Sequence, residues 1–382
     1  VGGALLLAAL SGERDLLCFD MGGTSCDVCL IAGGAVAETA ERVVAGRPLA
    51  LPALDIHTVG AGGGSIAWRD RGGALRVGPR SAGADPGPAC YGRGGQLPTV
   101  TDANLLLGRL PDDAPLAGGL ALDRDAAERA VAALARELGL DTQACAGGIA
   151  RVAESEMLGA LRVITVERGI DPRDFALMPF GGAGPSHACA MARELGIRRV
   201  LCPRASGVLS ALGLAAAAPR HDVSRTVLLR SAELTATRLE EVRESLLAEA
   251  DAALAGERCR ARVAYELRYH GQAFELAVEP GDPDDCGDPD ALRDAFAAAH
   301  EQRYGYREDA ASVELVNVRA SVWGPAPQLA PRAGDDSTAA LAPGARLTGP
   351  SVHALGDSTL YVAPGWSGGV DGRGTIVLED SR

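Results

Sequence analysis

The feature that most constrains this sequence is a pair of short apolar segments joined by glycines and bracketed by aspartates. Residues 16–20 are apolar up to Asp20, residues 21–25 contain a glycine pair, and residues 26–31 return as a second apolar segment that carries Asp27. Apolar runs separated by a glycine turn predict two paired strands. We therefore expect a β-hairpin that delivers one carboxylate on each strand.

The turn of this hairpin has the residue types of a phosphate site. Gly22 and Gly23 let backbone N–H groups approach an anion, and Thr24 and Ser25 add hydroxyl groups. The two flanking aspartates could hold Mg²⁺ through water, which suits an ion that gives up its water reluctantly. The alternative interpretation is a glycine hairpin with two solvated aspartates, because short motifs also occur without the function.

A second glycine turn lies between a predicted buried strand, residues 175–180, and a predicted helix, residues 186–195. Gly181, Gly182 and Gly184 occupy this turn. Helix N-termini carry free N–H groups and positive potential, so the turn predicts a cradle for an anion or a nucleotide. A strand–helix crossover that needs small residues for close packing is the alternative.

Two further glycine-rich segments, residues 57–65 and 83–92, suggest either close approach of the backbone to a ligand or a packed loop. His57, His187 and Asp102 lie beside glycines or at a helix end, and they are the candidates for an acid–base or metal role. A hydrogen-bonded structural histidine and a helix-capping aspartate are the alternatives.

Composition limits the possible partners. The 382 residues carry a net charge of −13, which disfavours non-specific binding to nucleic acid and to anionic membranes, and no apolar run reaches membrane-spanning length. All 37 basic residues are arginine, so a phosphate site must use backbone, hydroxyls, arginine and metal instead of a Walker-type lysine. Nine irregularly spaced cysteines predict a reduced, cytoplasmic protein. Cys26 and Cys29 would face opposite sides of a strand, so we expect buried thiols there.

The remaining pattern alternates helices and strands, which predicts an α/β protein. Helices are expected at residues 101–110, 123–140, 148–168, 238–255 and 288–303, and strands at residues 199–202, 262–278, 313–323 and 358–378. After Asp222 the pattern changes to a charged amphipathic helix followed by alternating strands. We therefore place a domain boundary near Arg225 and expect two domains, residues 1–225 and 226–382. The chain opens at Val1 without a methionine, and we expect it to be a piece of a longer or processed protein.

In this order, the segments resemble the hydantoinase A/5-oxoprolinase family, which also includes subunits of acetone and acetophenone carboxylases. The matching segments are residues 19–28, 57–65, 81–92, 98–104, 180–188, 268–272 and 300–306. They span nearly the whole chain. Two departures stand out, because Cys26 replaces a usual threonine and the family's first phosphate turn, of Asp-x-Gly-Gly-Thr form, is not in this chain. The resemblance therefore implies the C-terminal portion of such a protein.

The resemblance implies an actin-like, sugar-kinase-like ATPase fold, with two ribonuclease-H-like halves around a nucleotide and a small α+β C-terminal domain. Residues 1–225 would hold the second half of that core, and residues 226–382 would form the small domain. Residues 20–27 would then be the second-half phosphate turn, and residues 181–184 would lie at the nucleoside.

The implied activity is ATP-driven opening of a cyclic amide, such as a hydantoin or 5-oxoproline, through phosphorylation of the carbonyl oxygen. Asp20 and Asp27 would organise Mg²⁺ or water, residues 22–25 would hold phosphate, and His57 and Asp102 would lie near the ring or a second divalent metal. Family members often act with a hydantoinase B-type subunit, so a hetero-oligomer is expected. Two alternatives remain open: a subunit of an ATP-dependent ketone carboxylase, and a non-catalytic subunit or fragment that docks a partner.

Overall fold

The computed structural model describes residues 1–39, 42–44, 46–49, 53–111, 115–279, 287–308, 311–327 and 341–382. The chain forms two compact units, one made of Val1–Ala215 with Ala330–Arg382 and the other of Ala216–Leu329. The first unit contains all the glycine turns that the sequence singled out as possible binding sites.

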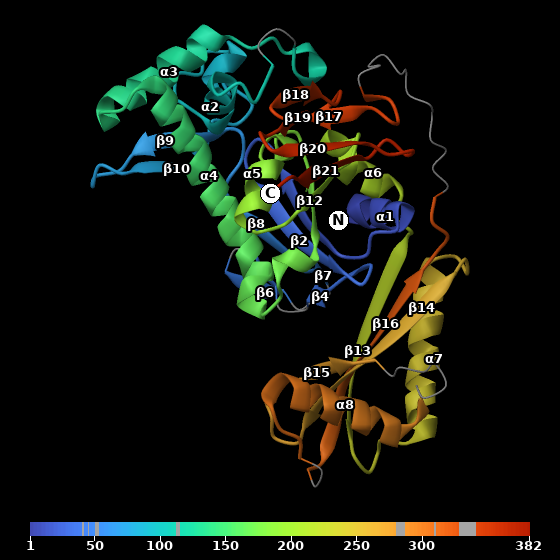
Figure 1. The fold of residues 1–382 in the computed structure, drawn as a ribbon. Coiled ribbons are helices and arrows are strands. Elements are labelled where there is room, and N and C mark those ends of the chain that lie inside the picture. The colour runs from blue at the N-terminus through green and yellow to red at the C-terminus, as the bar shows by residue number, and fades with distance from the viewer. Residues whose placement is uncertain are drawn as a thin grey trace. The chain divides into compact units, whose positions relative to one another are not determined.

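A mixed β-sheet forms the centre of the first unit (Figure 1). Its strands follow the order β17 (Arg346–Thr348), β20 (Trp366–Val370), β21 (Ile376–Asp380), β12 (Arg199–Cys202), β11 (Ala176–Phe180), β1 (Leu16–Met21), β2 (Cys26–Ala32) and β3 (Ala35–Val36), and β8 (Ile56–Val59) also pairs with β2. β1 runs parallel to β11, and β11 runs parallel to β12. The predicted hairpin is confirmed: β1 and β2 are antiparallel, with Asp20 directly opposite Asp27.

Helices cover both faces of this sheet, which explains why its central strands are apolar on both sides. One set of alternate side chains, including Phe19, packs into the core formed with α4 (Thr142–Ile164) and α5 (Ala188–Glu194). The other set packs with α1 (Gly2–Ser11) and α6 (Leu209–Ala215), which lie side by side in Figure 1. The position of a residue along β1 or β2 therefore determines which set of helices its side chain packs against.

The segment between β8 and β11 contains most of the helices predicted in this unit. It holds β9 (Ser65–Arg69), β10 (Leu75–Ser81), α2 (Val100–Leu106), α3 (Arg124–Leu138) and α4. Asp123 caps α3 and Gly139 ends it in the left-handed conformation, as the sequence predicted. The N-cap residue of α2 is Thr99, and Asp102 completes its capping box. α4 begins earlier than predicted because Asp141 caps it.

Shorter elements complete the described part of this unit. The strands are β4 (Glu38–Thr39), β5 (Arg42–Val44), β6 (Arg47–Leu49), β7 (Ala53–Leu54), β18 (Ser351–Ala354) and β19 (Thr359–Val362). The 3₁₀ helices are η1 (Ala89–Tyr91), η2 (Ala117–Gly119), η3 (Val166–Arg168), η4 (Pro172–Asp174), η5 (Gly184–Ser186) and η6 (Ser206–Val208).

The second unit is an antiparallel sheet with two helices. Its strands follow the order β13 (Arg220–Arg230), β16 (Val313–Trp323), β14 (Arg260–Tyr269) and β15 (Leu276–Val278). α7 (Ala236–Ala253) and α8 (Pro289–Tyr304) share one core cluster with the strands, centred on fully buried Tyr265 and Phe296. The predicted helices at residues 238–255 and 288–303 are therefore confirmed, and they pack on the sheet through their apolar sides.

The expected domain boundary at residues 225/226 does not match the division into compact units. Arg225 lies within β13, where it pairs with Val318 of β16, so a boundary there would split a strand. Residues 341–382, which we had assigned to the C-terminal domain, belong to the first unit, and β21 pairs with β12 in its central sheet. The alternation in residues 358–378 predicted strands correctly, but pattern alone does not reveal which strand is the partner.

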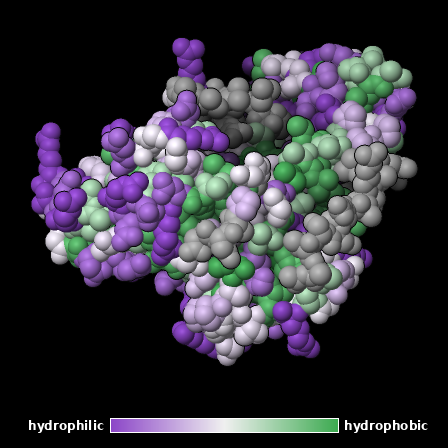
Figure 2. Space-filling model, turned by 90° about the horizontal axis from the view of Figure 1, so that it is seen from above, coloured by the Kyte–Doolittle hydropathy of each residue, from purple (hydrophilic) through white to green (hydrophobic). Residues whose placement is uncertain are grey.

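None of the helices in the described ranges is long and apolar enough to cross a membrane. On the face drawn in Figure 2, hydrophilic side chains are interspersed with hydrophobic ones.

The return of residues 341–382 to the central sheet can be tested at Trp366. Its side chain is fully buried in the core that also contains α4 residues. We expect Trp366→Ala to lower the free energy of unfolding by about 3–5 kcal/mol, the usual cost of emptying a buried aromatic site. Urea denaturation would measure this change, and hydrogen exchange would show faster opening of β11 and β12.

Trp68 provides the matched control, because 43% of its surface is exposed. Trp68→Ala should lower the free energy of unfolding by well under half as much as Trp366→Ala does. Equal effects of the two substitutions would contradict the assignment of Trp366 to the core of the first unit.

Candidate functional site

Backbone contacts from two other glycine segments hold the tip of the β1–β2 hairpin. The N–H of Gly63 donates to the carbonyl of Gly22 at 2.9 Å, and the N–H of Ala183 donates to the carbonyl of Met21 at 3.0 Å. These bonds join segments far apart in the sequence. We call the arrangement the hairpin clasp.

Two glycines of the clasp have no room for a side chain. At Gly62, a Cβ atom would lie 2.5 Å from the backbone nitrogen of Thr24. Gly181 has a φ of +80°, and a Cβ there would meet the Asp20 carboxylate. For the glycines in residues 57–65 the sequence suggests either close approach to a ligand or a packed loop. The structure shows that Gly62 allows close approach to the hairpin itself.

The clasp uses carbonyl groups of the hairpin and leaves N–H groups available. Within the described ranges, no group accepts a hydrogen bond from the backbone N–H of Gly23 or Thr24. The Thr24 hydroxyl lies 3.3 Å from the Ser81 hydroxyl. Free N–H groups beside hydroxyls at a turn are a suitable environment for an anion.

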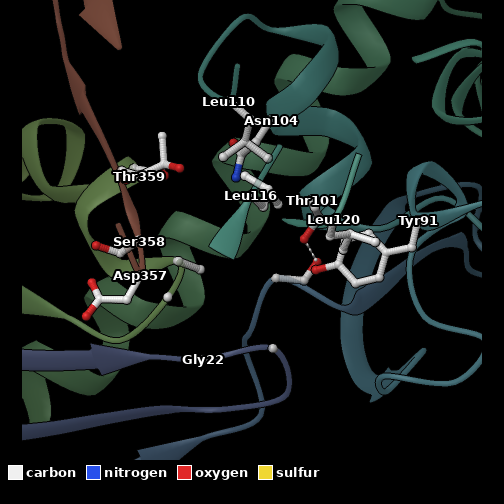
Figure 3. A pocket seen from close by; sticks show the side chains of 15 residues that line it. Gly22, Tyr91, Thr101, Asn104, Leu110, Leu116, Leu120, Asp357, Ser358 and Thr359 are labelled. Atoms are coloured by element: carbon white, nitrogen blue, oxygen red, sulfur yellow. Dashed lines mark hydrogen bonds between the residues drawn. The ribbon is translucent and has the colours of Figure 1, made fainter. Parts of the chain in front are cut away.

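A pocket of about 220 Å³ opens beside the hairpin tip, and we call it the glycine-lined pocket. Its walls come from the hairpin, Gly63, α2, the segment before α3, the turn after β11 and the segment at β19. Figure 3 shows the part of the lining around Gly22, Asn104 and Thr359. The lining residues are Gly22, Gly23, Gly63, Tyr91, Thr101, Asn104, Leu110, Leu116, Leu120, Gly182, Ala183, Ser186, Asp357, Ser358 and Thr359. The two predicted glycine turns therefore meet at one pocket, through Gly22, Gly23 and Gly182. Ser25, Gly181 and Gly184 do not line it.

Asp20 and Asp27 line a different pocket, of about 260 Å³, on the sheet face covered by α1 and α6. We call it the aspartate pocket. The Ser210 hydroxyl donates to Asp20 at 2.7 Å, and the Thr58 hydroxyl donates to Asp27 at 2.5 Å. Burial, helped by the charge of Asp27, raises the pKa of Asp20 above its ordinary value despite the bond from Ser210. The structure thus brings the two carboxylates together, as the hairpin predicted.

The structure does not bring His57 or Asp102 to either pocket. His57 pairs with Val28 on β8, and strand alternation places it on the sheet face opposite Thr58 and Asp27. No group of three or more potential metal ligands gathers around either residue, or elsewhere in the described part of the chain.

Asp102 is fully buried and has a structural partner for each carboxylate oxygen. It accepts hydrogen bonds from the backbone N–H groups of Cys90 at 2.8 Å and Thr99 at 2.9 Å, and from the Thr99 hydroxyl at 2.7 Å. With Thr99 it forms a capping box at the start of α2. The capping alternative weighed for this residue is the arrangement that the structure shows.

Sequence reasoning missed a buried polar network behind the glycine-lined pocket. The His187 ring is fully buried, with Nδ1 3.0 Å from Glu154 Oε1 and Nε2 2.9 Å from Asn104 Nδ2. Arg109 also contacts Glu154 Oε1, at 2.5 Å. Burial alone would raise the pKa of Glu154, but His187 and Arg109 offset it, so the pKa lies below its ordinary value. The signal in the sequence was a single carboxylate within the apolar stripe of α4.

The central sheet separates the side chains of Cys26 and Cys29. Cys26 packs in one core cluster and Cys29 in the other, on opposite faces of the sheet, as the strand period predicted. Burial raises the pKa of the Cys26 thiol well above its ordinary value, which leaves it an unreactive thiol.

Comparison with known proteins places this fold and these segments in a family. A family model described as hydantoinase/oxoprolinase matches residues 1–223, more than half of the chain. The chain belongs to the hydantoinase/oxoprolinase family. The resemblance deduced from the ordered segments is therefore confirmed.

Individual relatives of this hydantoinase/oxoprolinase chain carry different names. The alpha subunit of a caprolactamase from Pseudomonas jessenii is 35% identical over 98% of this chain and 59% of its own length. A crystal structure of the ATP-dependent caprolactamase from that organism superposes with a TM-score of 0.77 at 34% identity. This superposition covers 100% of this chain and 61% of that one. A 5-oxoprolinase of Arabidopsis thaliana is 35% identical over 87% of this chain and 28% of its length. A nucleotide-free acetone carboxylase structure has a TM-score of 0.81 at 26% identity, covering 99% of this chain and 60% of that one. The chain thus spans about 60% of the caprolactamase subunit, and its mixed α/β fold is similar to both solved structures.

Two glycines of the hairpin region should respond differently to alanine. At Gly22 a Cβ would meet no atom within 4 Å, so Gly22→Ala should keep the fold while placing a methyl group in the glycine-lined pocket. Gly62→Ala should push the hairpin tip away and destabilise the protein, by about 1–3 kcal/mol as for other overpacked sites. Thermal unfolding and nucleotide titration of both variants would measure this. A Gly62→Ala protein of unchanged stability would contradict the clasp.

The buried pair of Glu154 and His187 should make stability depend on pH. Because its folded-state pKa is lowered, Glu154 stabilises the protein above its unfolded-state pKa, and this stabilisation is lost as the pH falls through the folded-state value. Glu154→Gln should lower the free energy of unfolding by about 3 kcal/mol at pH 7, as when one partner of a buried pair is removed. The loss should be smaller at pH 4 or below. Urea denaturation across this range would test it.

Glu156, exposed on the same helix α4, gives the matched control. Glu156→Gln should change the free energy of unfolding very little at either pH. A Glu154→Gln effect that is no larger, or that does not shrink in acid, would argue against an ionised carboxylate in the network.

Proposed function

We propose that the complete protein uses ATP to open a cyclic amide, with the glycine-lined pocket as its nucleotide site. One observation carries the proposal: Gly22 and Gly23 of the hairpin and Gly182 of the second glycine turn line the same pocket. Free backbone N–H groups at one end suit phosphates, and leucines with Tyr91 at the other suit a flat ring. Family membership, together with relatives named 5-oxoprolinase and ATP-dependent caprolactamase, supports the reaction class.

In this proposal the first unit is the second half of an actin-like, sugar-kinase-like ATPase core. The parallel pairing of β1 with β11, and of β11 with β12, supports it, as does the antiparallel hairpin at its edge. The hairpin tip would receive phosphates, and the turn at residues 181–184 would lie beside the nucleoside. The second unit, Ala216–Leu329, would be the additional α+β domain.

The chemistry follows from the stability of an amide. An unstrained ring resists attack by water, so the γ-phosphoryl group is first transferred from ATP to the carbonyl oxygen, releasing ADP. Water then adds to the activated carbon, and the ring C–N bond breaks with protonation of nitrogen, which leaves an acyl phosphate. A second water hydrolyses this acyl phosphate to the carboxylate and inorganic phosphate. Catalysis of phosphoryl transfer depends mainly on positioning and charge neutralisation, which the backbone N–H groups of the turn would provide.

The aspartate pocket fits a magnesium ion held through water. Asp20 and Asp27 lie opposite each other on the hairpin, and each keeps one oxygen atom that its hydroxyl partner, Ser210 or Thr58, does not bind. Mg²⁺ held there would supply positive charge next to the hairpin. His57 and Asp102 have no part in this proposal, because neither lines the glycine-lined pocket or the aspartate pocket, and Asp102 belongs to the capping box of α2.

The proposal includes a partner subunit. The caprolactamase relative is named a subunit alpha, and this chain spans about 60% of that protein. We propose that the complete protein acts in a hetero-oligomer, with a hydantoinase B-type subunit supplying part of the amide-opening machinery.

A second candidate function is ATP-dependent carboxylation of a ketone, favoured by the similarity to acetone carboxylase. Both reactions begin with phosphorylation of an oxygen atom, so the hairpin residues do not distinguish them. ATP hydrolysis stimulated by 5-oxoproline, hydantoin or ε-caprolactam would support the first function. Stimulation only by a ketone together with bicarbonate would support the second.

Asp27→Asn tests the role of the aspartate pocket in the complete protein. The substitution keeps the shape and the bond from Thr58 but removes the charge, so ATP turnover should fall at least about 100-fold, the usual scale for a lost electrostatic contact in catalysis. Asp125→Asn, at an exposed position of α3, should leave turnover unchanged. Normal turnover by a correctly folded Asp27→Asn enzyme would remove Asp27 from the mechanism.

A further inference from the structure

The buried network leads to an atom that has no partner. Asn104 is on α2, 3% exposed, and it lines the glycine-lined pocket. Its Oδ1 atom is buried without a hydrogen-bond partner in the described part of the chain. Buried polar atoms nearly always have a partner, so an unpaired acceptor in a pocket wall indicates a group that arrives with a ligand.

The network determines which end of the Asn104 amide is available. Glu154 is bound by Arg109 and accepts from His187 Nδ1, so that ring nitrogen carries a proton. The amide nitrogen of Asn104 lies 2.9 Å from Nε2, which matches the ring tautomer that has its proton on Nδ1 and an acceptor at Nε2. The reverse orientation of the amide would require protons on both ring nitrogens. The carbonyl oxygen of Asn104 is therefore the end left for a ligand, which must supply a donor.

The pocket walls indicate where this donor lies on the ligand. Asn104 shares the wall with Leu110, Leu116 and Leu120, while the hairpin glycines lie at another side of the same pocket (Figure 3). A flat ring with an amino group on its edge fits the leucine side, and an anionic tail fits the glycine side.

We propose that Asn104 Oδ1 accepts a hydrogen bond from the exocyclic amino group of the purine base, making Asn104 the residue that selects adenine nucleotides. Glu154 and His187 are positioning residues, because they act only through the orientation of the amide. This inference rests on the proposed function, since it takes the glycine-lined pocket as the nucleotide site.

The test compares ATP with purine riboside 5′-triphosphate, which lacks the amino group, by isothermal titration of the complete protein with Mg²⁺. The wild-type protein should bind ATP roughly tenfold more tightly, the scale of one buried hydrogen bond. In Asn104→Leu the two affinities should become nearly equal. Gln143→Leu, which replaces an exposed amide on α4, should keep the wild-type ratio.

The outcomes separate this inference from the proposed function. Equal affinities in the wild-type protein would overturn the role of Asn104 while leaving a nucleotide site, and this measurement does not depend on the variant folding. An Asn104→Leu protein that keeps the preference would overturn it as well. If the variant changed the KM of the cyclic amide but not the nucleotide ratio, the donor would belong to the amide. Absence of binding by both nucleotides would overturn the proposed function itself.

Discussion

The hairpin clasp is the constraint on which the candidate site depends. Backbone N–H groups from two distant segments bond to the carbonyls of Gly22 and Met21, and they do so because Gly62 and Gly181 leave no side chain between the chains. A hydrogen bond to a carbonyl oxygen fixes the plane of its peptide group. The N–H group of the next residue lies in the same plane, so its direction is fixed as well. The direction of these N–H groups is thus set by main-chain geometry alone.

The central sheet separates the two parts of the candidate site. Because side chains alternate along a strand, Asp20 and Asp27 lie on the face covered by α1 and α6. The pocket lined by the hairpin glycines is bordered by elements of the other helix layer, including α2. Charge is therefore held in one pocket and backbone donors in the other, with a single hairpin contributing to both.

The buried network of Arg109, Glu154, His187 and Asn104 makes one wall of the glycine-lined pocket rigid. A buried carboxylate is tolerated only when it is well paired, and here both a guanidinium and an imidazole contact one oxygen of Glu154. The network connects α2, α4 and the start of α5. This network holds the Asn104 amide in one orientation, because Arg109, Glu154 and His187 already bond to one another.

The local features of this protein were determined by its sequence. Strand alternation and a glycine pair specified the β1–β2 hairpin and the pairing of Asp20 with Asp27, and Asp123 and Gly139 marked both ends of α3, since these signals act within a few residues. The ordered segments also identified the family. Tertiary structure alone decided that residues 341–382 join the central sheet, and that the buried Asp102 accepts a hydrogen bond from the backbone N–H of Cys90. It also decided that His187 meets Asn104, 83 residues away, because contacts between distant segments depend on how whole elements pack, and no local pattern records that.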